Sequence, residues 1–276
     1  MCRRRAPPGL IGAFLSVPTD RGDMAEGDDI PATHPRHDSL VTRHRIESGV
    51  EAGITSKQGL IAEGRGEAFD YLLGERTLPS ADAAARAAAA HLLLARHPVI
   101  SVNGNAAALV PDELVALAAA VGADLEVNLF NRTEERMAAI AAHLRDHGAS
   151  GVKGLDADAR IPGLDHERAK VDADGIADAD VVLVPLEDGD RAAALADLGK
   201  VELVIDLNPL SRSAQVADVP IVDNILRAIP NVTAHARDLV TADRDDLERI
   251  VAEFDPDAAL DDAEQAIRAG DLSQRS

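Results

Sequence analysis

The stretch VELVIDLNPLSRS, Val201 to Ser213, sets the pattern from which the fold is predicted. It begins as a short apolar strand and then changes abruptly to polar residues, a proline and an arginine. An apolar run that stops in this way is typical of a strand that surfaces beside a ligand, at the carboxyl edge of an open α/β sheet. The same letters also fit an ordinary strand followed by a turn, and the stretch alone leaves both interpretations open.

Similar apolar runs recur along the chain and alternate with helical patterns. The predicted strands are PVISVNG (98–104), DLEVNLF (124–130), DVVLVPL (180–186), VELVIDL (201–207) and VPIVD (219–223). Helices are predicted between them, and three more, at about 39–52, 57–73 and 81–96, precede the first strand. Short apolar strands joined by helices predict an α/β fold: a Rossmann-like parallel sheet with helices on both faces, preceded by an N-terminal helical segment.

Three segments are expected along the chain. Residues 1–29 are predicted to be a disordered or mis-assigned leader, because prolines interrupt their apolar stretch and Met24 offers a second plausible start. Residues 30–240 are predicted to form a single α/β domain together with its N-terminal helices. Residues 241–276 are predicted to be an acidic C-terminal helical tail.

The charge balance is strongly acidic: 48 Asp and Glu against 28 Lys and Arg give a net charge of −20. This charge disfavours nucleic acid and anionic membranes as partners. Only four of the basic residues are lysines, and acidic surfaces of this kind keep proteins soluble at high salt, so a halophilic source is predicted. The single cysteine and the absence of a long apolar run predict a cytoplasmic protein without disulfides.

Polar clusters follow four of the predicted strands. They begin at Asn105, at Asn131, at Glu187 and at Asn208. Because parallel strands share a direction, these clusters are expected to meet at a crevice where the strand order reverses, although helix capping explains any one of them alone. The chain lacks a G-x-x-x-x-G-K-[ST] motif and a complete dinucleotide fingerprint, which disfavours P-loop hydrolysis and hydride transfer.

Clusters of cations stand out against the acidic background. Arg65 lies between Gly64 and Gly66, where the backbone allows close approach and a planar guanidinium grips a phosphate. Arg43 lies in SLVTRHR, and Arg168 and Lys170 lie in HERAK. These clusters predict a site for a polyanion, with surface ion pairs as the alternative.

Long blocks of the sequence resemble one known family. HPRHDSLVTRHRI, GITSKQGLIAEGRGEAFDYLLGERT, HPVISVNGNAAALVP, EVNLFNRTEERM, RIPGLDHERAKVD and VIDLNPLSRSA follow in order from about residue 30 to beyond residue 230. They look like archaeal phosphopantothenate synthetase, the 4-phosphopantoate–β-alanine ligase family. The resemblance implies an ATP-binding ligase domain in a homodimer of coenzyme A biosynthesis. It also implies ATP-dependent condensation of 4-phosphopantoate with β-alanine to 4′-phosphopantothenate, which forms AMP and pyrophosphate through an acyl-adenylate.

The resemblance also implies which residues contact the nucleotide. These are Arg43, Arg65, Asp206, Leu207, Asn208, Arg212, Ser213, Asn224 and Ile225. Mg²⁺ is expected to bridge the ATP phosphates, with direct protein ligands left open. An adenine-nucleotide sensor without catalytic activity and a Rossmann-type oxidoreductase remain as alternatives.

Residue type and position predict the rest of the site. Arg168 and Lys170, or Arg191, are expected to neutralise 4-phosphopantoate. Asp188 and Asp190 are expected to hold either magnesium or the ammonium group of β-alanine. Ion pairs within the loops are the alternative for each of these residues.

Overall fold

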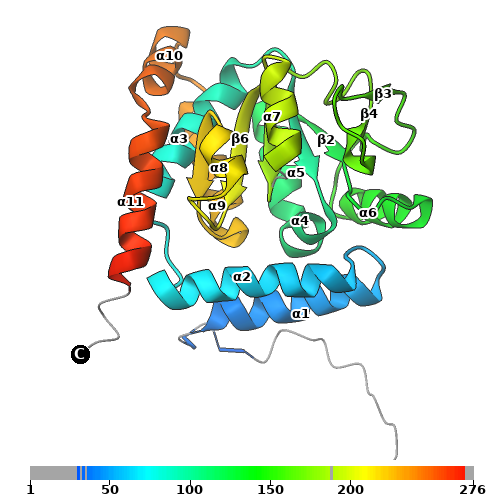
Figure 1. Ribbon diagram of the computed structural model, residues 1–276, viewed down its shortest axis with the longest axis horizontal. Coiled ribbons are helices and arrows are strands. Elements are labelled where there is room, and N and C mark those ends of the chain that lie inside the picture. The colour runs from blue at the N-terminus through cyan, green and yellow to red at the C-terminus, as the bar shows by residue number, and fades with distance from the viewer. Residues whose placement is uncertain (1–29, 32, 35, 187–188, 271–276) are drawn as a thin grey trace, which may run out of the picture.

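A five-stranded parallel sheet forms the centre of the protein (Figure 1). The structure is a computed structural model that describes residues 30–31, 33–34, 36–186 and 189–270; the predicted leader, 1–29, lies outside these ranges. The strands are β1 (Pro98–Val102), β2 (Asp124–Val127), β5 (Val181–Pro185), β6 (Val201–Asp206) and β7 (Val219–Val222). Their order is β2-β1-β5-β6-β7, so the order reverses between β1 and β5. The predicted parallel α/β sheet is therefore confirmed.

Helices surround this sheet. The long ones are α1 (His37–Glu51), α2 (Lys57–Leu73), α3 (Pro79–Leu94), α5 (Pro111–Val121), α6 (Glu134–Asp146), α7 (Gly189–Asp197), α9 (Ile225–Leu239), α10 (Arg244–Glu253) and α11 (Pro256–Ala269). Two short helices, α4 (Gly104–Leu109) and α8 (Arg212–Val216), follow β1 and β6. A two-stranded antiparallel pair, β3 (Ala159–Arg160) and β4 (Lys170–Val171), flanks the 3-10 turn η1 (Glu167–Ala169). The short elements were not predicted because they are too brief to show a period.

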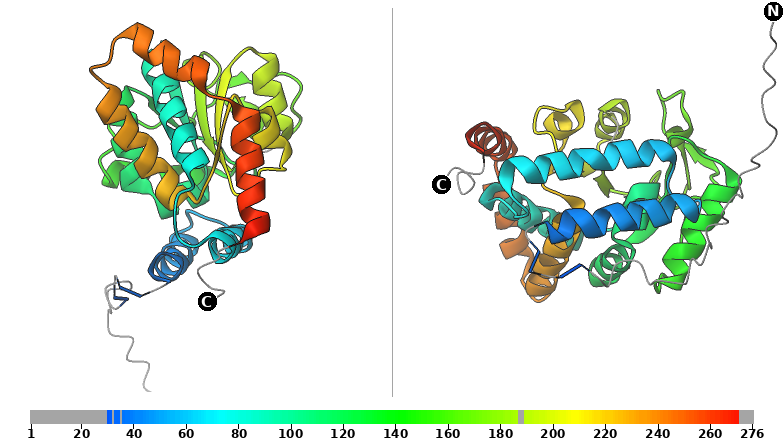
Figure 2. Two further views of the ribbon diagram at one scale, coloured as in Figure 1. Left: turned by 90° about the vertical axis from the view of Figure 1, so that its left-hand side faces the viewer. Right: turned by 90° about the horizontal axis from the view of Figure 1, so that it is seen from below.

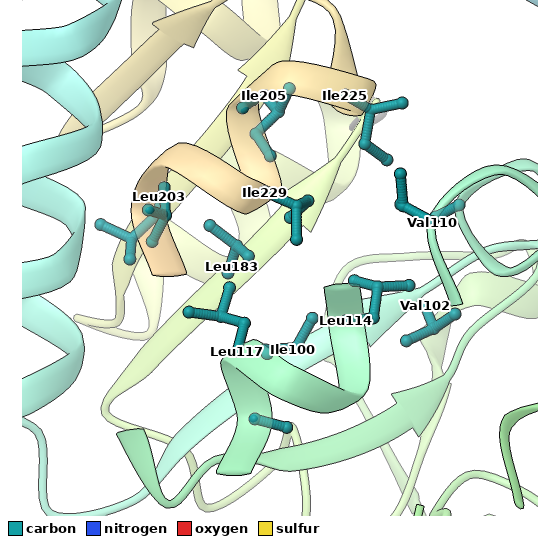
Figure 3. Packing of buried hydrophobic residues seen from close by; sticks show 14 of the residues in the cluster. Ile100, Val102, Val110, Leu114, Leu117, Leu183, Leu203, Ile205, Ile225 and Ile229 are labelled. Carbon is teal, nitrogen blue, oxygen red and sulfur yellow. The ribbon is translucent and has the colours of Figure 1, made fainter. Parts of the chain in front are cut away.

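The two faces of the sheet bury alternate residues of each strand. Ile100 and Leu183 face α5 and α9, where they pack with Leu114, Leu117 and Ile229 (Figure 3). The next residues along the strands, such as Val99 and Val182, pack on the other face with Leu195 of α7. Burial on both faces explains why the strands read as continuous apolar runs, and it confirms the predicted helices on both faces.

A hairpin of α1 and α2 lies across the carboxyl end of the sheet (Figures 1 and 2). At one end of α2, the amide Nδ2 of Asn105 donates to the carbonyl of Gly59, at 3.0 Å. At the other end, Phe69 and Leu73 pack with Val222 of β7. The N-terminal helical segment is therefore a cover over the edge at which ligands bind in open α/β sheets.

The acidic C-terminal segment forms α10 and α11. α11 packs along β7 and α3, and Ala263 joins the apolar cluster that holds the end of α2. The predicted helices are confirmed, whereas the domain boundary at residue 240 stays a prediction. Of the final residues, 271–276 lie outside the described ranges.

Candidate active site

The end of β1 meets the end of β5 at the point where the strand order reverses. Asn103 caps α4 by accepting from the backbone N–H of Ala106, at 2.9 Å. Its Nδ2 donates to the carbonyl oxygen of Pro185, at 2.8 Å, and so ties the two strand ends together. A crevice outside the carboxyl ends of the strands at this point is where doubly wound sheets bind ligands.

A cavity of about 240 Å³ opens at this point, between α2 and the ends of β1, β2 and β5. We call it the arginine cavity. It is lined by Thr55, Ser56, Gln58, Gly59, Ala62, Arg65, Asn103, Gly104, Asn105, Asn128, Leu129, Phe130, Asn131, Arg136, Arg168 and Leu186. Three of the described residues in the lining are arginines and none is Asp or Glu. In a protein of net charge −20, a described lining with three arginines is suited to an anion.

Two of the three arginines donate hydrogen bonds to neutral oxygens, which fix the direction of their side chains. Arg136 Nη1 donates to the carbonyl of Asn131, at 2.7 Å, and partial burial lowers the pKa of Arg136. Arg168 is buried, and its Nε donates to Oδ1 of Asn128, at 3.1 Å. Arg65 is exposed at the opposite wall of the cavity, on α2. Arg65 and Arg168, which were both predicted to bind anions, therefore line the same cavity.

Glycines bring the backbone close on the floor of the arginine cavity. A Cβ atom at Gly104 would lie 2.5 Å from the carbonyl oxygen of Ile54, and one at Gly59 would lie 2.3 Å from Oδ1 of Asn105. Leu186, in the lining, has φ of +53° and is the only non-glycine residue in the described ranges with a positive φ. Backbone conformations of this kind gather at binding sites, where the surrounding structure holds them.

The turn after β6 is organised by Asp206. The Asp206 Oδ2 atom accepts from the hydroxyls of Ser211, at 2.6 Å, and Ser213, at 3.1 Å, and Oδ1 accepts from the backbone of Asn208. Arg212 is exposed and pairs with Asp190 at the start of α7. The four predicted nucleotide residues of this turn are thus brought together, with Leu207 packed beneath them. Since a carboxylate has about four acceptor positions, Asp206 keeps capacity for a further donor.

A second cavity, of about 330 Å³, lies on the other side of α2, between α1, α2 and the start of α9. We call it the carboxylate cavity. It is lined by Ser39, Thr42, Arg43, Ile46, Glu47, Leu60, Glu63, Gly64, Glu67, Asp70 and Asn224. Arg43, at its mouth, donates from Nε to Oε2 of Glu67, at 2.9 Å, and this hydrogen bond lowers the pKa of Glu67. The predicted nucleotide residues Arg43 and Asn224 therefore line this cavity, whereas Arg65 lines the other.

A buried ion network fixes α2 to α9 beside this cavity. Arg227 pairs with Asp70 at 2.6 Å and with Asp223 at 2.8 Å, and Asn224 donates to Asp70 at 3.0 Å. Burial raises the pKa of both aspartates despite these hydrogen bonds. Ile225, also predicted as a nucleotide residue, is buried in the first turn of α9. The network positions Asn224 and α2 together.

Three predicted catalytic residues lie elsewhere or outside the described ranges. Lys170 pairs with Glu167 at 2.8 Å and is absent from the lining of both cavities. Arg191 is fully buried on one face of the sheet, where it donates to the hydroxyl of Ser101 at 3.3 Å. Asp188 lies outside the described residues. Of the three that the structure describes, Arg168 alone lines one of the two cavities.

Several residues of the two cavities were not predicted as site residues: Asn103, Asn128, Arg136 and Glu63. Asn103 and Asn128 stand at strand ends, so the polar ends of the strands were a usable signal. Arg136 and Glu63 face inward from helices, and only the docking of α2 and α6 against the edge reveals them. None of the described helices is long and apolar enough to cross a membrane.

Comparison with known proteins identifies the family. The phosphopantothenate/pantothenate synthetase family model matches residues 80–270. A protein of Thermococcus kodakarensis named 4-phosphopantoate–β-alanine ligase is 56% identical over 241 residues, 87% of this chain and 92% of the relative. A protein of the same name from Methanosarcina mazei is 51% identical over 235 residues, 85% of this chain and 92% of the relative. The chain therefore belongs to the phosphopantothenate/pantothenate synthetase family.

Proposed function

We propose that this protein condenses 4-phosphopantoate with β-alanine to 4′-phosphopantothenate, with ATP cleaved to AMP and pyrophosphate. The observation that carries the proposal is the 56% identity, over nearly the whole relative, to a protein named for these two substrates. The arginine cavity supports it, because 4-phosphopantoate carries a phosphate and a carboxylate and a cavity lined by three arginines suits such an anion.

We place the acid in the arginine cavity. Arg168 and Arg136 hold the phosphate in this proposal, since both line the arginine cavity and both donate hydrogen bonds to neutral oxygens at its edge. Arg65 lies on the side of the cavity formed by α2 and meets the carboxylate and the α-phosphate of ATP. Lys170 and Arg191 do not contact the ligand in this proposal: Lys170 pairs with Glu167, and Arg191 serves the packing of α7 on the sheet.

The nucleotide runs along the carboxyl edge from β7 towards β1. Asn224 and Ile225 hold one end, Asp206 to Asn208 contact the ribose, and Arg212, Ser213 and Arg43 contact the phosphates in this proposal. The acid carboxylate attacks the α-phosphate, pyrophosphate leaves, and the acyl-adenylate remains. Such a step needs positioning and cations that stabilise developing charge, and it needs no protein nucleophile.

Magnesium supplies charge neutralisation on the phosphates. No group of three metal-ligating side chains that fits a metal ion occurs among the described residues. Mg²⁺ often keeps several waters and binds through phosphate oxygens with one or two carboxylates. Among the described carboxylates we choose Asp190 as the contributor, because it is exposed and paired with Arg212 beside the turn after β6.

A homodimer is proposed from an unpartnered face of α2. Leu60, Ile61, Tyr71 and Leu72 are all exposed there, with Ile61 at 78%. They share one face of the helix, opposite the face that covers the sheet, and an apolar helical face of this kind seeks a partner. Pairing of α2 with α2 of a second copy about a two-fold axis would bury this apolar face. Ile61→Asp is expected to give a monomer in analytical ultracentrifugation, and an unchanged mass contradicts this interface.

High salt and a cytoplasmic setting are proposed as the working conditions. The net charge of −20 repels itself in dilute buffer, and screening by salt relieves that repulsion. The free energy of unfolding is therefore expected to rise as KCl is raised. Stability that rises as the salt is removed contradicts the halophilic proposal.

Product formation tests the function. In high salt with Mg²⁺, pyrophosphate is expected to appear only when ATP and 4-phosphopantoate are both present, and AMP with amide only when β-alanine is added. A nucleotide sensor without catalytic activity would release no pyrophosphate. An oxidoreductase would change the absorbance of a nicotinamide cofactor instead. Either of those results contradicts the proposed function.

A further inference from the structure

The carboxylate cavity contains a buried acid that the proposed nucleotide and acid contacts leave unused. Glu63, on α2, is only 9% exposed, and it lines the cavity. None of the described residues donates a hydrogen bond to its carboxylate. A buried carboxylate without a partner costs free energy, and it is retained where a ligand completes it.

The surroundings of Glu63 select a cation. The charged groups that face the cavity are Glu47, Glu67 and Asp70 together with Arg43, which is engaged by Glu67. Beyond the cavity, Arg65 lies two residues away on the same helix, and its charge acts on Glu63. The lining is thus negative at Glu63, and its one cation, Arg43, stands at the mouth.

A glycine leaves space beside the carboxylate. A Cβ atom at Gly66 would lie 2.9 Å from Oε1 of Glu63 and 3.2 Å from Nδ2 of Asn224. Glycine inside a helix costs about 1 kcal/mol relative to alanine. Its presence here keeps the carboxylate accessible next to Asn224, and Gly64 leaves the wall of the same cavity without a side chain.

We infer that the carboxylate cavity binds the amine substrate, with the Glu63 carboxylate accepting the ammonium group of β-alanine and removing its proton. This inference rests on the proposed function. The ammonium end of β-alanine meets Glu63 inside the cavity, where Glu67 and Asp70 add negative charge, while Arg43 is left to the ATP phosphates as proposed above.

The proton transfer prepares the second half of the reaction. The ammonium of β-alanine gives one proton to Glu63, and the nitrogen lone pair attacks the carbonyl carbon of the acyl-adenylate. The new C–N bond forms, the bond from carbon to the phosphate oxygen breaks, and AMP leaves with that electron pair. The second proton leaves the nitrogen to water. Burial and the charge of Asp70 raise the pKa of Glu63 to about 7, which suits a base at neutral pH.

Glu63→Gln tests the inference, because the amide keeps the shape and cannot take the proton. Exchange of labelled pyrophosphate into ATP, with 4-phosphopantoate and without β-alanine, is expected to stay within about twofold of the parent. The rate of AMP formation that depends on β-alanine is expected to fall by about 100-fold or more, which is the rate acceleration that one general base contributes. Hydroxylamine, which is largely uncharged at pH 7, is expected to restore AMP formation in this variant. Glu51→Gln, at the exposed end of α1, is the matched control and should match the parent in all three reactions.

The possible outcomes separate the inference from the proposed function. If Glu63→Gln lowers the exchange and the amide reaction together, Glu63 serves the nucleotide or the fold, and the inference is overturned. Amide formation at the parental rate overturns it as well. A parent that shows no exchange refutes the proposed function and the inference with it. A melting temperature of Glu63→Gln at or above the parental value excludes misfolding as the cause of a loss.

Discussion

The two sides of α2 carry opposite charge. On one side, the arginine cavity is lined by Arg65, Arg136 and Arg168, without Asp or Glu among its described residues. On the other side, the carboxylate cavity is lined by four acidic residues and Arg43. A ligase that joins an anionic acid to a cationic amine has to bind opposite charges close together without pairing them off. In the function that we propose, α2 keeps these charges apart, because different residues lie on its two sides.

The largest expected effect is on stability, and it comes from the residue that anchors α2 and therefore positions both cavities. Arg227 holds Asp70 of α2 and Asp223 of the sheet edge, and its loss leaves two buried carboxylates without their cation. Arg227→Ala is expected to lower the free energy of unfolding by about 3 to 5 kcal/mol. Urea denaturation in high salt measures this loss. Arg244→Ala removes an exposed i,i+4 pair with Glu248 and should cost less than about 0.5 kcal/mol. Equal losses in the two variants contradict the anchoring role.

The next effect acts on the arginine cavity alone. Arg65→Ala is expected to lower kcat/KM for ATP. The loss of transition-state stabilisation should be about 2 to 4 kcal/mol, which is the contribution of one electrostatic hydrogen-bond donor. Arg65→Lys should recover only part of the loss, because a point charge replaces a planar fork. Arg268→Ala, which removes a surface pair with Glu264, serves as the control. Activity of Arg65→Ala within about twofold of the parent refutes the role of Arg65.

A smaller effect concerns the carboxylate cavity and pH. Since the pKa of Glu63 is raised from 4.5 to about 7, the folded protein holds more protons than the unfolded chain between these values. Stability therefore falls as pH rises through this window, and buried Glu126 adds to the same slope. At pH 8, Glu63→Gln is expected to be more stable than the parent by on the order of 2 kcal/mol, with no difference below pH 4. A variant that is less stable at pH 8 contradicts this account of the cavity.

The smallest expected effect is on the affinity for ATP, and it concerns Asp206 in the turn after β6. Asp206→Ala is expected to weaken ATP binding by about 1 kcal/mol, because one hydrogen bond to the ribose is lost. The variant should also lose the preference for ATP over 2′-deoxy-ATP. Competition binding of the two nucleotides measures this preference. If the variant unfolds, or if parent and variant discriminate equally, Asp206 serves only the turn of Ser211 and Ser213. The nucleotide is then held chiefly through Arg43, Arg65 and Arg212.

The fold was largely predictable because its signals are local. Each central strand is a short apolar run that ends in polar residues, as VELVIDL does before Asn208, and burial on both faces makes such runs unmistakable. The helices of the hairpin were predicted within a residue or two of their bounds. The short helices α4 and α8 were missed, because five or six residues carry no measurable period.

The site was less predictable because it depends on how α2 docks. Sequence spacing placed Arg65 and Glu63 two residues apart, and only the helical geometry sends them to different cavities. Arg191 follows a strand end as a ligand residue would, yet it turns back into the core to meet Ser101. Residue type and strand position thus locate the edge, while the direction of each side chain comes from tertiary packing.

The division of labour across α2 is tested most directly by the Michaelis constants of two variants, Arg65→Lys and Glu63→Gln, measured for all three substrates in one set of conditions. We expect Arg65→Lys to raise KM for ATP and 4-phosphopantoate while leaving KM for β-alanine within about twofold. Glu63→Gln should do the reverse, raising KM for β-alanine alone. If both variants raise all three constants alike, the two cavities are one site, and the separation of acid and amine by α2 is wrong.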